Sequence, residues 1–195
     1  MKYPLDLRFK VLAFAPQLTL HDAEGTPILY VRQKLFRFKE KVEVFQSKAK
    51  EKVLATIEAD RIIDWSAKYA FALPDGRALG SVGRKGMRSI WRAHYEVSQG
   101  DSAFLIREEN PWAKVGDGLL GDLPIIGLLS AVLFHPKYLA SGGAGATPVM
   151  RLTKKPAFFE GKFEIEKLAD DLSPDQEMAL LFSFLMMILL ERSRG

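Results

Sequence analysis

The apolar segment near the C-terminus is the feature that most constrains what this chain can fold into. Residues 178–190 contain a single polar residue, Ser183. Just before them, Ser173 is a good N-cap, Pro174 suits the first helical position, and Gln176 completes a capping box. The pattern predicts a helix that begins near residue 174 and has no polar face.

A helix that is apolar on every side needs apolar surroundings on every side. Thirteen helical residues rise about 20 Å, less than the roughly 30 Å of a bilayer's hydrocarbon core. Because most of the chain before this segment has strand and turn character, we expect a sheet curled around the helix. A barrel filled in this way has little room for a substrate inside.

Extended segments joined by polar turns recur about every 25 residues through the first half of the chain. Pro74-Asp75-Gly76 is one strong turn signal, because Pro presets φ and Gly accepts a positive φ. With further candidates at 5–13, 149–153 and 162–168, we expect about eleven or twelve strands. The predicted fold class is therefore mainly β, a barrel enclosing one hydrophobic C-terminal helix.

The bulk properties limit the class of protein. A length of 195 residues favours a single domain over residues 1–195. The lack of cysteine excludes disulfides, thiolate catalysis and cysteine zinc sites. Charges among the first ten residues differ from a signal peptide, so we expect a cytoplasmic location. A net charge of +4 and a pI near 9.2 favour anionic partners.

Residues 110–147 interrupt the hairpin pattern and are interpreted as an apolar and Gly-rich insertion. Asp122 and Pro124 argue against one spanning helix, and a short helix over 124–134 is expected instead. Residues 141–148 are expected to form a flexible loop that returns to the sheet. The insertion either caps one end of the barrel or contacts a membrane or a protein partner. Its candidate contact residues are Leu119, Leu120, Ile125, Ile126, Leu128 and Leu129.

Two basic stretches are the main candidates for a binding site. Such clusters bind anionic lipid headgroups, with about 1 kcal/mol from each well-placed charge. A solvated strand face is the alternative, and nucleic acid is disfavoured because no base-stacking aromatic residues clearly accompany the charges. The candidate headgroup residues are Arg32, Lys34, Arg37, Lys39, Arg84, Lys85, Arg88 and Arg92.

The sequence contains no catalytic motif. His21, His94 and His135 lie far apart and show no metal-ligand spacing. The glycines at 142–146 lack the phosphate-binding pattern that ends in Gly-Lys-Ser/Thr. We therefore expect no catalytic residues, no metal and no cofactor.

Three segments resemble a known family. Residues 28–34, the hairpin at 74–82 and the stretch from Arg84 to Val97 look like those of the LURP-one-related proteins, which group with the tubby C-terminal domain and the phospholipid scramblases. The resemblance implies a roughly twelve-stranded barrel wrapped around a hydrophobic C-terminal helix. It does not extend to calcium binding, since no acidic cluster has scramblase-like spacing, and the insertion departs from the compact tubby barrel.

The leading functional hypothesis is a non-enzymatic binding module that associates peripherally with anionic phospholipid membranes. One alternative is a small-ligand carrier or enzyme with a site at the barrel rim, near His94 and His135. The other is a protein-interaction scaffold, which differs from the leading hypothesis in its partner.

Overall fold

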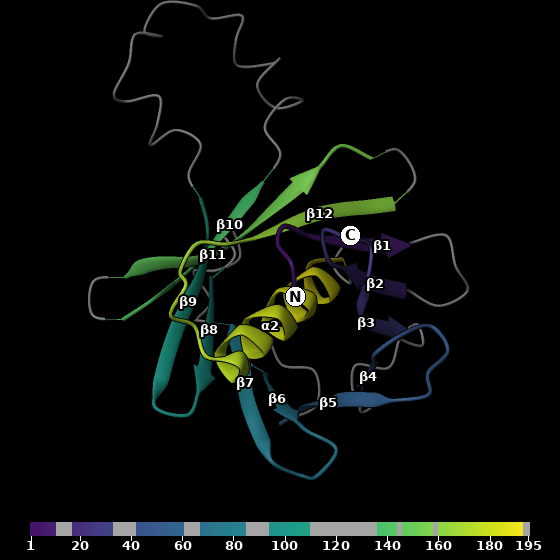
Figure 1. Cartoon of the computed structure of the whole chain (residues 1–195). Coiled ribbons are helices and arrows are strands. Elements are labelled where there is room, and N and C mark those ends of the chain that lie inside the picture. Colours follow the sequence, from purple (N-terminus) through teal and green to yellow (C-terminus); the bar gives the residue numbers. More distant parts are fainter. Residues whose placement is uncertain are drawn as a thin grey trace, which may run out of the picture.

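The protein is a closed antiparallel β-barrel with one helix along its inside, as seen in a computed structural model (Figure 1). The structure describes residues 1–10, 17–32, 42–60, 67–84, 94–109, 136–143, 146–157 and 160–192. Each strand pairs with its neighbours in the sequence, and β12 pairs with β1 to close the barrel. The strands are β1 (Leu5–Lys10), β2 (Gln17–His21), β3 (Pro27–Arg32), β4 (Val42–Phe45), β5 (Val53–Ala59), β6 (Lys68–Ala72), β7 (Ala78–Arg84), β8 (His94–Gln99), β9 (Ser102–Glu108), β10 (Lys137–Gly142), β11 (Thr147–Lys155) and β12 (Glu160–Lys167), and the helix is α2 (Pro174–Arg192).

The strands alternate between core and solvent, as a barrel wall requires. In β1 the side chains of Leu5, Leu7 and Phe9 are buried, whereas Arg8 and Lys10 between and beyond them are exposed. Successive strand residues point to opposite faces, so every second side chain faces the interior. This confirms the prediction of a mainly β protein with eleven or twelve strands around one helix.

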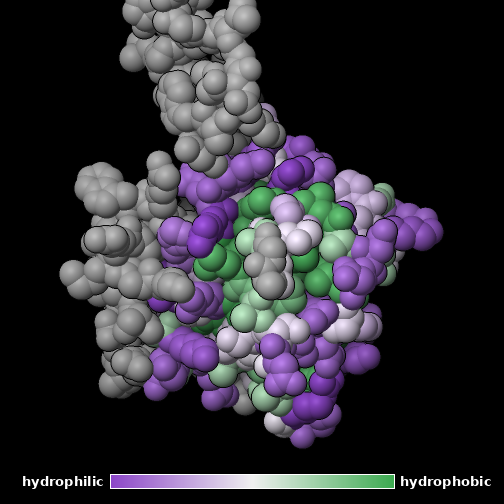
Figure 2. Space-filling view, turned by 90° about the vertical axis from the view of Figure 1, so that its left-hand side faces the viewer, coloured by the Kyte–Doolittle hydropathy of each residue, from purple (hydrophilic) through white to green (hydrophobic). Residues whose placement is uncertain are grey.

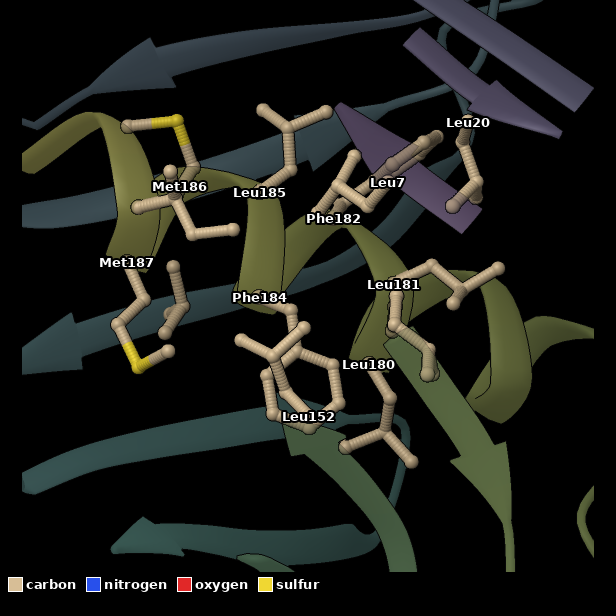
Figure 3. Close-up of a cluster of buried hydrophobic side chains, with 14 of the residues drawn as sticks. Leu7, Leu20, Leu152, Leu180, Leu181, Phe182, Phe184, Leu185, Met186 and Met187 are labelled. Atoms are coloured by element: carbon tan, nitrogen blue, oxygen red, sulfur yellow. The ribbon is translucent and has the colours of Figure 1, made fainter. Parts of the chain in front are cut away.

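The helix α2 fills the barrel. The side chains of residues 179–189 are buried on every side of the helix, and they pack against inward-facing strand residues such as Leu7, Leu20 and Leu152 (Figure 3). The ring of Phe182 meets the ring of Phe71 edge to face, with centroids 5.6 Å apart. The one buried hydroxyl on the helix, that of Ser183, donates to the carbonyl of Ala179 at 2.7 Å.

The predicted capping box is present at the start of α2. The backbone N–H of Gln176 donates to Ser173 Oγ at 3.2 Å, and the backbone N–H of Ser173 donates to Gln176 Oε1 at 2.9 Å. Two amide donors that the helix itself leaves unpaired are thereby satisfied.

One strand lies inside the segment that the sequence analysis assigned to an insertion. Within 110–147, residues 137–142 form β10, which pairs with β9 on one side and β11 on the other. The expected loop 141–148 also shortens to a tight turn, because Ser141 and Gly142 belong to β10 and Thr147 begins β11. The expected short helix at 124–134 lies outside the described residues.

Candidate functional site

Packed side chains occupy the interior of the barrel over the described residues, and the candidate sites lie on its outer surface. All odd-numbered strands run in one direction and all even-numbered strands in the other, because every pair is antiparallel. One end of the barrel, here called the cationic rim, therefore collects the last residues of odd strands and the first residues of even strands. Six of these twelve residues are Lys or Arg, against two Glu. The six are Lys10, Arg32, Lys68, Arg84, Lys137 and Lys155.

The opposite end, here called the acidic rim, differs in charge. Its strand-terminal residues include one charged side chain, Lys167, and Lys167 Nζ lies 3.2 Å from Glu177 Oε2. The turns at this end carry more acid than base. Their acidic residues are Asp22, Glu24, Glu51, Asp75, Asp101, Asp170 and Asp171, and their basic residues are Lys48, Lys50, Lys52 and Arg77.

Most cations of the cationic rim are available to a ligand. Among the described residues, the side chains of Lys10, Arg32, Lys68 and Lys137 form no ion pair or hydrogen bond. Lys155 Nζ lies 2.7 Å from Glu164 Oε1. Arg84 lies close enough to Tyr95 to act electrostatically on its hydroxyl.

Two of the eight predicted headgroup residues can be placed, and both lie at the cationic rim. Arg32 ends β3 and Arg84 ends β7. Lys34, Arg37, Lys39, Lys85, Arg88 and Arg92 lie outside the described residues, in the connections from β3 to β4 and from β7 to β8. Leu119, Leu120, Ile125, Ile126, Leu128 and Leu129 are also outside them, in the connection from β9 to β10. All three connections begin and end at the cationic rim.

Tyrosine–glutamate hydrogen bonds hold the two ends of the central helix. At the cationic rim, Tyr95 Oη donates to Glu191 Oε1 at 2.8 Å. At the acidic rim, Tyr3 Oη donates to Glu177 Oε1 at 2.7 Å. Burial and the neighbouring carboxylates raise the pKa of both hydroxyls above its ordinary value. Sequence reasoning missed these four residues, although a carboxylate at each end of an apolar helix was a visible signal.

A polar groove runs along the outer wall over β1, β2 and β12. It has a volume of about 800 Å³ and is lined by residues that include Arg8, Lys10, Lys162, Asp6 and His21. Among the described residues the imidazole of His21 has no hydrogen-bond partner. The outward-facing residues of neighbouring strands form the groove, so sequence spacing alone could not reveal it.

A second groove, of about 640 Å³, lies at the acidic rim beside the β10–β11 turn and is partly apolar. It is lined by Phe104, Val149 and Leu172, together with the carboxylates of Asp101 and Asp171. Figure 2 shows apolar side chains gathered in one area of the molecular surface and ringed by hydrophilic ones.

The histidines do not converge. His21 ends β2 at the acidic rim, His94 begins β8 at the cationic rim, and His135 lies outside the described residues. Over the part of the chain that the structure describes, no three His, Asp or Glu side chains are grouped as a metal site would require. A site built from both His21 and His94 is excluded.

The chain was compared with protein-family models, curated proteins and solved structures. None of them matches it.

No helix in the described ranges is both long enough and apolar enough to cross a bilayer. The helix α2 is the apolar C-terminal helix that the sequence predicts. Strand residues surround it along its length, as the short apolar segment predicted.

Proposed function

We propose that this protein is a non-enzymatic binding module that associates peripherally with anionic phospholipid membranes through its cationic rim. The observation that carries the proposal is the segregation of charge between the two ends of the barrel. One rim has six basic strand termini, whereas the turns of the other are predominantly acidic. A molecule with this asymmetry has a preferred orientation at a negatively charged surface.

The connections at the cationic rim strengthen the proposal. By sequence, residues 33–41 contribute Lys34, Arg37, Lys39 and Lys41 against the single acid Glu40, and residues 85–93 contribute three bases and no acid. Each Lys or Arg near an anionic leaflet contributes about 1 kcal/mol. The sum suffices for reversible association that high salt weakens.

The apolar residues of the β9–β10 connection are a second proposed contact with the membrane. Leu119, Ile126 and Leu129 are followed by His135 and Lys137, a mixture typical of segments that enter the headgroup region. Binding through charge alone is sensitive to salt, whereas buried apolar side chains make binding resistant to it. The proposed module combines both.

Membership of the LURP-one-related and tubby-like group is part of the proposal. The closed twelve-stranded barrel around a C-terminal helix is the architecture that the resemblance implied. Among the described residues, the side chains of the helix and the inward-facing strand side chains pack together inside the barrel, so the proposed binding role uses the outer surface.

Vesicle flotation tests the proposal. Wild-type protein should float with phosphatidylserine-containing vesicles at low salt and remain in solution with pure phosphatidylcholine. Reversal of two rim charges in Arg32→Glu/Lys137→Glu should abolish flotation, while the matched acidic-rim variant Lys50→Glu/Lys52→Glu should float like wild type. Full retention of the wild type in the soluble phase beside anionic vesicles would overturn the proposal.

The insertion is tested in the same assay with Ile126→Asp/Leu129→Asp. If the connection enters the membrane, this variant loses the part of flotation that survives high salt. Unchanged salt-resistant flotation would restrict the contact to the charged residues.

A protein-interaction scaffold is the second candidate, and the groove at the acidic rim favours it. Phe104, Val149 and Leu172 line this groove beside Asp101 and Asp171, which suits a peptide with an apolar anchor next to basic residues. Leu172→Asp should abolish capture of such a partner without affecting vesicle flotation. Loss of both activities in this variant would instead indicate a folding defect.

A further inference from the structure

Three cations lie side by side across the outer wall of the barrel. In the strand register, Lys155 of β11 is directly opposite Lys162 of β12, and Lys162 is directly opposite Arg8 of β1. The row continues to Thr19 of β2, which is directly opposite Arg8. Residues of β11, β12 and β1 become neighbours only because the barrel closes between β12 and β1.

This arrangement is unfavourable for the fold. Like charges directly opposite each other on antiparallel strands destabilise the pair. Arg8 and Lys155 are partly compensated, since Arg8 Nη2 lies 2.8 Å from Asp6 Oδ2 and Lys155 Nζ lies 2.7 Å from Glu164 Oε1. Lys162, in the middle of the row, has no ion pair among the described residues.

The row crosses the polar groove over β1, β2 and β12. This groove also contains other polar atoms that have no hydrogen-bond or ion-pair partner among the described residues. Lys10, two residues beyond Arg8, has no ion pair in the described part of the chain. Toward the acidic rim, Asp6 Oδ1 is buried from solvent and accepts no hydrogen bond. His21 is directly opposite Asp6. Lys10 and Lys162 thus present two amines without ion-pair partners among the described residues, at the end of the groove nearer the cationic rim.

We propose that this groove binds the phosphate group of a phosphate monoester. The phosphate oxygens accept from Lys162 and Lys10, which relieves the repulsion along the row. Such a phosphate occurs both in phospholipid headgroups and in soluble phosphate esters, and the inference does not rest on the membrane association proposed above.

Calorimetric titration tests the site with glycerol 3-phosphate and with inorganic phosphate as probes. Wild-type protein should bind both, because each probe carries the phosphate group that Lys162 and Lys10 would contact. Lys162→Gln should weaken binding about tenfold or more, since it removes a charge-assisted hydrogen bond. The matched variant Lys52→Gln, on the β4–β5 turn, should bind like wild type.

Thermal unfolding supplies an independent measurement on the same variants. Without phosphate, Lys162→Gln should have a higher Tm than wild type, because the substitution removes the repulsion at the centre of the row. With phosphate, the Tm of wild type should rise by more than that of Lys162→Gln. A lowered Tm for Lys162→Gln, or equal binding of glycerol 3-phosphate by wild type and this variant, would overturn the proposal.

Flotation with phosphatidic acid vesicles distinguishes the two sources of the phosphate. Loss of flotation in Lys162→Gln would assign the site to a lipid headgroup. Unchanged flotation, together with weakened binding of glycerol 3-phosphate, would assign it to a soluble ester. If wild type fails to float but binds glycerol 3-phosphate through Lys162, the membrane proposal fails and the phosphate site stands.

Discussion

At the scale of single residues, tyrosine–glutamate hydrogen bonds tie both ends of the central helix to the barrel. The middle of the helix is apolar, and apolar contacts are less directional than hydrogen bonds. The hydroxyls of Tyr3 and Tyr95 bond to Glu177 and Glu191 at the two ends, and these directional contacts define the position of α2 along the barrel axis.

Removal of one of these hydroxyls tests that role. Tyr95→Phe should lower the free energy of unfolding by about 1–3 kcal/mol, because a hydrogen bond to a charged group is lost from a largely buried site. Urea denaturation measures the change. Tyr69→Phe is the matched control, since the hydroxyl of Tyr69 has no hydrogen-bond partner among the described residues, and it should change stability little. Equal effects of the two variants would contradict the role assigned to Tyr95.

The tyrosines also determine how stability depends on alkaline pH. Burial, with the nearby carboxylates of Glu108 and Glu191, raises the pKa of Tyr138 to about 12, from 10.0. The pKa values of Tyr3 and Tyr95 are raised in the same direction. Above pH 10 the folded protein therefore binds more protons than the unfolded chain, and the contribution to stability is lost as the pH rises from about 10 toward 12. Urea unfolding at a series of pH values should show a steady decline in this range, and a flat profile would contradict it.

At the scale of elements, β7 approaches its neighbours so closely that one position requires glycine. A Cβ added at Gly80 would lie 2.5 Å from the carbonyl oxygen of Ser98 and 3.5 Å from Cβ of Ala179 on the helix. The first of these contacts is with backbone of the adjacent strand, so it cannot be relieved by a side-chain rotation.

Two alanine substitutions in the same strand test this close approach. Gly80→Ala should destabilise the protein by about 1–3 kcal/mol through overpacking. Gly83→Ala places its Cβ no closer than 3.6 Å to any neighbour, at Lys68 Cγ, and should be tolerated. Thermal unfolding of the pair gives the comparison. A greater loss of stability in Gly83→Ala would contradict the packing described for β7.

The sequence predicted most elements correctly and missed one for a physical reason. The capping box of α2 and most of the strands follow from local signals, namely side-chain chemistry, alternation and turn residues. The strand β10 was interpreted as part of a flexible Gly-rich segment. Its Gly142 instead meets a packing requirement, because a Cβ there would lie 2.6 Å from Cδ1 of Phe104 on β9. Sequence alone does not distinguish a glycine needed for flexibility from one needed for close contact.

At the scale of the whole molecule, barrel and helix form one core. The side chain of Leu185 is 1% exposed, in the middle of a helix that strands surround. Leu185→Asp should prevent stable folding, since an unpaired buried charge costs several kcal/mol. Leu185→Met keeps the volume and should cost less than about 1.5 kcal/mol. Circular dichroism and size-exclusion chromatography report the outcome, and a well-folded monomeric Leu185→Asp protein would refute the enclosed helix.

The candidate sites could be predicted only in part from the sequence. The basic stretches were visible as local clusters, but only the strand directions bring Arg32 and Arg84 to one rim. Lys155 and Lys162 come from the C-terminal strands, and Arg8 comes from the first strand. They form one row because β12 pairs with β1. Charges that are distant in sequence become one surface through topology, which composition and local patterns do not specify.

On the proposed function, the cationic rim, and not the acidic rim, faces an anionic membrane. The chain has no cysteine, so single cysteines introduced for labelling give unambiguous positions. An environment-sensitive fluorophore on Gln17→Cys, at the cationic rim, should shift to the blue when phosphatidylserine vesicles are added, whereas the same label on Glu51→Cys, at the acidic rim, should not change. A blue shift at Glu51→Cys, or none at either position, would contradict the account.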